Sequence, residues 1–135
     1  MSRSGSCLCG SVSLRLEGDP IRSLKCYCTE CQKLTGSDHL QALWVKQDQL
    51  TVTGELLKVV RVGESGNTVE NYFCKNCLNR VYGLAPKTRV AIVPIPLLDD
   101  ISGLEPTMAI YTSSAMPWTQ VSDTLKCYEK MPGSK

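Results

Sequence analysis

The chain of 135 residues has no long hydrophobic run. No apolar stretch approaches the roughly 20 residues that a membrane-spanning helix needs, so we expect no membrane segment. The lysines and arginines are scattered, without the basic stripe that is typical of nucleic-acid binding, so no nucleic-acid partner is expected. The N-terminal "MSRSGSCLCG" lacks the apolar core of a secretory signal, which predicts a cytoplasmic protein with reduced thiols.

The sequence also has no internal repeat and no linker. With 42% hydrophobic and 21% charged residues, its composition is that of a globular protein. A domain of this size buries about two thirds of the surface that its unfolded chain exposes, so it needs no disulfide bonds for a stable core. We therefore expect one domain over residues 1–135, and the sequence leaves its oligomeric state open.

Cysteine, in contrast, is abundant, because the chain has eight and seven of them lie in three tight groups. The groups are "SCLCG" at residues 6–10, "KCYCTECQK" at 25–33 and "FCKNC" at 73–77. Disulfide pairing is disfavoured in a reducing compartment, where clustered cysteines more often bind metal. Cys127 stands apart from the groups, and an ordinary thiol is expected there.

The first cysteine group is followed by a predicted strand. Val12, Leu14 and Leu16 alternate with polar residues, as in a half-buried strand that begins directly after Cys7 and Cys9. Residues i and i+2 of an extended chain point to the same side, so this Cys-x-Cys pair is expected to present both sulfurs on one face.

Further strands are predicted in apolar segments that end at glycine, proline or polar residues. These segments are residues 40–45, 50–54, 56–62, 68–74, 89–95 and 108–114, with a hairpin loop at 63–67. Helix is expected only as one or two turns at residues 28–36 and 97–104, because Pro94, Pro96 and Pro106 limit it. The predicted fold class is mainly β, with antiparallel sheets and little helix.

The number of clustered cysteines constrains the metal sites. A structural zinc site usually has four protein ligands, so seven cysteines divide most simply into a group of four and a group of three. Three protein ligands leave one position for an exchangeable ligand, as in catalytic zinc sites. The close spacing of Cys26, Cys28 and Cys31 suits the group of three. Spacing alone leaves other divisions open, and four thiolates also suit iron.

Five motifs, "CLCGSV", "CYCTECQKLTGS", "FCKNC", "LLDD" before "LEP", and "YTSSAMPW", extend over nearly the whole chain. In these motifs the sequence resembles the glutathione-dependent formaldehyde-activating enzymes and their relatives, such as centromere protein V. The resemblance implies a β-tent of antiparallel sheets built around a structural zinc. It also implies two zinc ions per chain, a structural one held by Cys7, Cys9, Cys74 and Cys77, and an open one held by Cys26, Cys28 and Cys31.

Three positions depart from the family pattern. Tyr27 stands where relatives often have histidine, Leu78 where glycine is usual, and Ala109 where histidine is frequent. Metal ligation is expected to survive all three departures, while the residues around the open zinc affect the choice of substrate. Because Tyr27 lies between two predicted ligands, it is the candidate for a catalytic side chain beside Cys26 and Cys28.

Other side chains have a functional and an ordinary interpretation. Lys33, with Lys25 and Arg61, could pair with a carboxylate of glutathione, although scattered basic residues are mostly solvated. His39 is the only histidine and could complete the open site, but a histidine beside the core is the more common role. Trp44 could line a pocket, or pack in the core as most aromatics of β proteins do.

These inferences favour a zinc-dependent carbon-sulfur lyase. In this hypothesis the glutathione sulfur occupies the open position of the second zinc, where metal binding deprotonates a thiol near neutral pH. A small aldehyde then forms or releases an S-hydroxymethyl adduct, and both the aldehyde and this chemistry come from the resemblance. The alternative is a zinc-stabilised module without turnover, which binds a thiol or another small ligand or serves as a scaffold.

Overall fold

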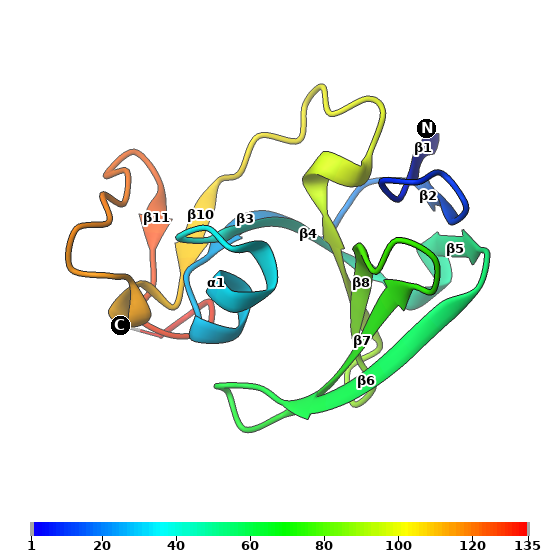
Figure 1. The fold of residues 1–135 in the computed structure, drawn as a ribbon. Helices are drawn as coiled ribbons and strands as arrows, with labels where there is room; N and C mark the ends of the chain where they lie inside the picture. The colour runs from blue at the N-terminus through cyan, green and yellow to red at the C-terminus, as the bar shows by residue number, and fades with distance from the viewer. Residues whose placement is uncertain (1, 135) are drawn as a thin grey trace.

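The computed structural model describes residues 2–134, which form two β-sheets, one α-helix and three single-turn 3-10 helices. The smaller sheet is antiparallel, with the strand order β1-β2-β5. Its strands are β1 (Ser2–Ser6), β2 (Ser13–Glu17) and β5 (Leu50–Thr53). In Figure 1 this sheet lies at the opposite end of the molecule from the C-terminal strands.

The larger sheet has eight strands in the order β11-β10-β3-β4-β9-β8-β7-β6. They are β3 (Arg22–Cys26), β4 (Leu40–Lys46), β6 (Leu56–Val62), β7 (Thr68–Cys74), β8 (Arg80–Ala85), β9 (Val90–Pro94), β10 (Met108–Ile110) and β11 (Lys126–Cys127). The mainly β class is confirmed. The sheet is mixed, however, because β10 pairs in parallel with both β3 and β11. A long connection from β9 makes this possible, since parallel pairing needs a crossover.

Helix α1 (Thr29–Thr35) confirms the turn or two expected in the second cysteine group. Cys28 caps its first turn by accepting a hydrogen bond from the Cys31 amide, and Gly36 ends it with φ 67°. The 3-10 helices are η1 (Gln47–Gln49), η2 (Ile95–Leu97) and η3 (Thr112–Ser114). Helix α1 therefore determines the position of Cys31, the last of the three cysteines in this segment.

The second helix expected, at residues 97–104, is wrong. Only the last residue of η2 falls in this segment, which continues as a bend and a turn. The Asp100 carboxylate accepts hydrogen bonds from the amide and hydroxyl of Ser102, and the Asp100 carbonyl accepts one from Arg3. Such local side-chain bonds compete with helix formation.

Four strands, β1, β3, β8 and β11, were not expected from the apolar pattern. Strand β1 has the sequence SRSGS and becomes a strand through its pairing with β2, where Gly5 lies opposite Leu14. A Cβ atom on Gly5 would lie 2.2 Å from the carbonyl oxygen of Leu97, so only glycine allows this close approach. These strands form because they pair and pack with other segments of the chain. Such contacts need not produce an alternating apolar pattern in the sequence.

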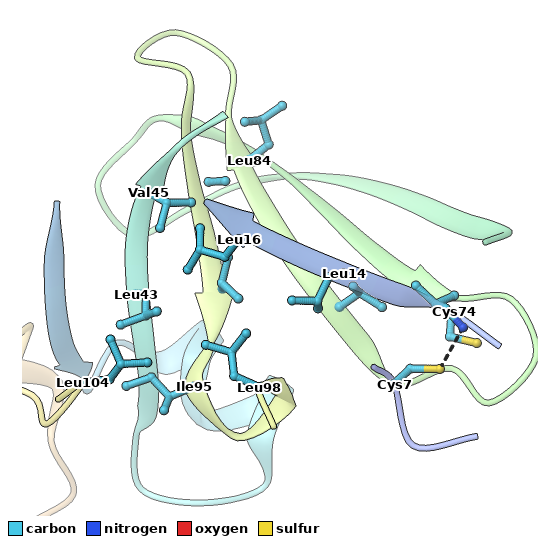
Figure 2. Close-up of a cluster of buried hydrophobic side chains, with 14 residues drawn as sticks. Cys7, Leu14, Leu16, Leu43, Val45, Cys74, Leu84, Ile95, Leu98 and Leu104 are labelled. Atoms are coloured by element: carbon cyan, nitrogen blue, oxygen red, sulfur yellow. Dashed lines mark hydrogen bonds between the residues drawn. The ribbon is translucent and has the colours of Figure 1, made fainter. Parts of the chain in front are cut away.

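Strands β4 and β9 separate two clusters of buried side chains, because alternate residues point to opposite faces of a sheet. On the face toward β2, the cluster drawn in Figure 2 includes Leu43, Val45, Ala91 and Val93. The opposite face contributes Ala42, Trp44 and Ile92 to the second cluster. Cys7 and Cys74 belong to the first cluster, and Cys26 and Cys28 belong to the second. The larger sheet therefore separates these two pairs of cysteines.

Candidate metal centres

Four sulfurs, from Cys7, Cys9, Cys74 and Cys77, lie within 4.8 Å of one another. Cys9 Sγ is 3.6 Å from Cys7 Sγ and 3.7 Å from Cys74 Sγ. A tetrahedral zinc with Zn–S bonds of about 2.3 Å separates its sulfur ligands by about 3.8 Å. The donor type, the number of donors and their separations therefore fit one zinc ion, and a closed site of this kind is typically structural.

The Cys7–Cys9 pair reaches this geometry through a turn. The Gly10 amide donates to the Cys7 carbonyl (3.1 Å), and Leu8 between the two cysteines is exposed. The expectation that an extended chain aligns these sulfurs is therefore wrong. The turn is tied to the second pair by the Leu8 amide, which donates to the Asn79 side chain at 2.9 Å.

Hydrogen-bond donors contact three of the four sulfurs, those of Cys7, Cys9 and Cys74. The amides of Val12 and Cys77 donate to Cys7 Sγ and Cys74 Sγ, each at 3.4 Å, and the Asn76 side chain donates to Cys9 Sγ. Hydrogen bonds from Ser11 and then Asn76 lower the pKa of Cys9 to about 5. Thiolates are the form that binds metal, so these contacts prepare the site for a cation.

Leu78, one of the three departures from the family pattern, lies in the turn of the Cys74–Cys77 pair. Its φ is 63°, a left-handed conformation that suits glycine, and its amide closes the Cys74–Cys77 turn by donating to the Cys74 carbonyl at 2.8 Å. The side chain is 63% exposed, so it stabilises no core that would offset the strain. The turn thus forms with leucine where glycine would fit better.

The three sulfurs of Cys26, Cys28 and Cys31 also lie within 4.8 Å of one another. Cys26 ends β3, Cys28 caps α1, and Cys31 lies in the first turn of that helix. No carboxylate, imidazole or further thiol of residues 2–134 joins this group. An ion bound by these three cysteines would keep one position without a protein ligand.

Proton sharing within this group indicates that three thiolates need a cation. Hydrogen bonds from Cys26 and Cys31 lower the pKa of Cys28 to about 3. The bond that Cys26 donates to Cys28 raises the pKa of Cys26 to about 12, and the pKa of Cys31 is raised by its bonds to both. Ionisation of the first thiol is therefore favourable, whereas ionisation of the other two is unfavourable, because like charges repel at this distance. A divalent ion removes that repulsion.

A cavity of about 270 Å³ opens beside the three sulfurs, which form part of its wall. Its apolar lining comes mostly from the second buried cluster, and includes Leu24, Leu40, Ala42, Trp44, Ile92 and Ile110. The tip of the β6–β7 hairpin covers one side of the cavity through Glu64, Ser65 and Asn67. The predicted hairpin loop at residues 63–67 is confirmed, and the structure adds that it borders the site.

The hairpin tip is fastened to the cysteine segment by one carboxylate. Glu64 accepts hydrogen bonds from the amide and hydroxyl of Thr29, both at 3.0 Å, and from the hydroxyl of Ser114 at 2.6 Å. Burial alone would raise the pKa of Glu64, but the bonds from Ser114 and Thr29 outweigh it and lower the pKa. This carboxylate therefore joins three distant segments at the edge of the cavity.

Tyr27 and His39 lie together, away from the three sulfurs. Tyr27 is 2% exposed, does not line the cavity, and packs against the His39 ring with 5.2 Å between centroids. His39 Nδ1 lies 2.5 Å from the Asp38 carboxylate. Tyr27 directly follows β3, and alternate side chains of an extended chain point to opposite sides, which accounts for its absence from the wall that Cys26 and Cys28 form.

The remaining candidates are spread over the molecule. Lys33 is exposed on α1 and is not among the residues that line the cavity. Cys127 is exposed on β11, and Ala109 is buried in β10. Trp44 lines the cavity, which agrees with the pocket interpretation of this residue.

Glu64 and Arg80 line the cavity, but the sequence did not predict them as site residues. Glu64 belongs to a hairpin loop whose position over α1 no local pattern encodes, and Arg80 is one of many scattered basic residues. A charged residue three positions after a Cys-x-x-Cys pair is a weak signal, because such neighbours are usually solvated.

The fold and the two cysteine groups define a mainly β protein with two sites suited to metal ions, one of them without a fourth ligand from residues 2–134. A sequence profile of the family described as glutathione-dependent formaldehyde-activating enzyme matches residues 2–114. The chain belongs to this family, which confirms the resemblance seen in its motifs.

Among solved structures, the fold is similar to that of a Rhodobacter sphaeroides protein determined as a Northeast Structural Genomics target. The TM-score is 0.56 at 17% sequence identity, over 74% of this chain and 91% of that one. At this identity the similarity concerns the fold alone. Within residues 2–134, no helix has the length and hydropathy needed to cross a bilayer.

Proposed function

We propose that the protein is a carbon-sulfur lyase that binds a thiol, with glutathione as the first candidate, at an open zinc site. The zinc is held by Cys26, Cys28 and Cys31, while Cys7, Cys9, Cys74 and Cys77 hold a structural zinc. The observation that supports the proposal is the convergence of three sulfurs on a cavity wall, where no other described residue offers a fourth ligand. Family membership supports glutathione and formaldehyde as its small molecules.

Zinc bound at the open site supplies a positive charge that keeps a ligand thiol deprotonated near neutral pH. The chain's own residues provide the rest. Cys26, Cys28 and Cys31 present their sulfurs toward the cavity, and α1 holds two of them rigidly at its start. Glu64 keeps the hairpin tip against α1, so that water is excluded from one side of the reacting sulfur. The adduct then forms or breaks inside a partly dry cavity.

The glutathione backbone is expected to extend out of the cavity. Its two carboxylates and its ammonium group need charged or polar partners, and the walls of the cavity are mostly apolar. Lys33, exposed on α1, is the proposed partner of one carboxylate outside the cavity. A reducing compartment such as the cytoplasm suits this function, because both sites require reduced cysteines. We assign Tyr27 no part in the reaction.

Cobalt substitution tests this proposal, since thiolate-to-cobalt absorption bands report the sulfur ligands of each ion. Glutathione is expected to change the bands of one of two cobalt ions in the wild type and in Cys127→Ser. Cys28→Ser is expected to abolish that change. An adduct assay with formaldehyde then separates the lyase from a thiol-binding module without turnover. If glutathione leaves both cobalt ions unchanged in the wild type, the open site is refuted.

A further inference from the structure

The cavity beside the three sulfurs is more apolar than its proposed ligands. Alternate side chains of β4 and β9 form its floor, and Leu24 and Ile110 continue that surface. The charged residues that line it are Glu30, Glu64, Arg80 and Lys87. Formaldehyde has no apolar part, and the charges of glutathione gain nothing from such walls. The apolar surface is therefore unexplained by either molecule.

One polar side chain in the lining of this cavity has a buried nitrogen without a partner among the described residues. Arg80, at the start of β8, donates from Nε (3.1 Å) and Nη2 (2.7 Å) to the side-chain oxygen of Asn71. Its third nitrogen, Nη1, is buried and has no hydrogen-bond partner among the described residues. A guanidinium nitrogen in that state carries a desolvation penalty that a ligand oxygen would remove.

The surroundings of Arg80 hold it in this position. Asn71 is 1% exposed in β7, so the oxygen that accepts both bonds is itself fixed. A Cβ atom on Gly83 would lie 2.5 Å from Arg80 Nη2, so the glycine leaves the space that the guanidinium fills. A side chain confined on two sides in this way is suited to positioning a ligand.

We propose that the cavity takes an apolar aldehyde with a chain of several carbons, whose carbonyl oxygen accepts a hydrogen bond from Nη1 of Arg80. The inference rests on the proposed function, because the thiol bound at the open site is the nucleophile. The thiol sulfur forms a bond to the carbonyl carbon, and the C=O π pair moves to the oxygen. That oxygen takes a proton from water and the thiol proton is released to water, so no oxidant or reductant is needed.

Arg80 acts where charge develops, because the carbonyl oxygen becomes negative as the carbon–sulfur bond forms. A preorganised charged donor at that position stabilises the addition. The apolar walls provide affinity for the carbon chain, and each buried methylene strengthens binding by about fourfold. Chain length and Arg80 therefore make separate, measurable contributions.

Binding can be measured without turnover by using amides, which have a carbonyl oxygen and do not react with thiols. The zinc-loaded Trp118→Phe variant leaves Trp44, in the cavity wall, as the only tryptophan. Hexanamide is expected to change the Trp44 fluorescence saturably and to bind at least tenfold tighter than acetamide. Equal affinities for the two amides would refute the apolar chain site.

Arg80→Met in the same background is expected to weaken hexanamide binding about tenfold while zinc content and the folded structure are retained. Arg15→Met, at an exposed arginine of β2, is the matched control and should bind as the parent does. Unchanged hexanamide affinity in Arg80→Met would overturn the role of Arg80.

A second variant keeps the test valid if Arg80→Met does not fold. Ala42→Leu adds three carbons to the cavity wall and is expected to abolish hexanamide binding, with two bound zinc ions as the check that the variant is folded. Binding that survives Ala42→Leu would place the amide elsewhere. If hexanamide binds but glutathione is silent, the thiol function fails and the apolar site stands. If glutathione changes the cobalt bands but the two amides bind equally, the thiol function stands and the apolar site is refuted.

Discussion

The two cysteine groups differ in what they hold together. The four-cysteine group joins segments 65 residues apart, and Cys7 and Cys74 lie side by side at one end of the buried cluster between the sheets (Figure 2). The three-cysteine group spans six consecutive residues and borders a cavity. The same ligand chemistry therefore crosslinks the fold in one place and presents an open face in the other. Distance along the chain and burial make that difference.

The largest effect is expected from Cys74→Ser, which breaks the crosslink. Cys74 is fully buried, and structural zinc contributes directly to the free energy of folding. We expect the loss of one zinc and a decrease of about 4 kcal/mol or more in the free energy of unfolding. Zinc content and thermal unfolding check this, with Cys127→Ser as the control. A variant that melts like the wild type would show that the four-cysteine group does not stabilise the fold.

The matching substitution in the other group, Cys28→Ser, should leave the fold intact. Serine is a good N-cap residue, so it can replace Cys28 Sγ as the acceptor for the Cys31 amide. We expect a change of about 1 kcal/mol or less in stability, together with the loss of one zinc and of glutathione binding. Unfolding curves and titration calorimetry measure both. Global unfolding of this variant would remove the contrast between the groups.

Glu64→Gln tests whether the hairpin closes only the three-cysteine site. Glutamine loses one of the acceptors that bind Thr29 and Ser114, so the hairpin-tip amides should exchange with solvent about tenfold faster. Glu105→Gln, at an exposed residue, is the control. Exchange at the four-cysteine turns should not change. Unaltered exchange at the hairpin would show that Glu64 does not hold it.

The same carboxylate predicts a pH dependence. A lowered pKa means that the folded state favours the charged form of Glu64, so its contribution is complete above the ordinary value of 4.5. It is lost as the pH falls below 4.5 through the lowered pKa. Hairpin exchange in the wild type should therefore accelerate in this range, whereas Glu64→Gln should show no such step.

The smallest effect, and a stabilising one, is expected from Leu78→Gly. Glycine removes the strain of φ 63° beside Cys77, and part of this gain is offset by the greater backbone entropy of unfolded glycine. We expect the free energy of unfolding to rise by about 0.5–1 kcal/mol. Denaturant unfolding of the zinc-loaded protein measures this. A decrease would mean that the exposed leucine has a contact that outweighs its strain.

Several elements could be predicted because their information is local. The strands at Leu40, Leu50, Leu56 and Thr68 have apolar patterns bounded by turns, and α1 begins at a capping residue. Strand β1 could not be predicted, because its residues are polar and it depends on partners far along the chain. Residues 97–104 were misjudged because the side-chain bonds of Asp100 compete with a helix.

By itself, the sequence determined the donors, since seven clustered cysteines in a short chain can form one closed and one open thiol site, and it determined the family through their spacing. The tertiary structure decided which sulfurs meet, which side chains form the cavity wall, and that Arg80 and Glu64 stand beside it while Tyr27 and Lys33 do not. The physical reason is that ligand type and local turns are properties of neighbouring residues. A cavity, in contrast, is formed by strands and loops that meet only after the sheets have paired.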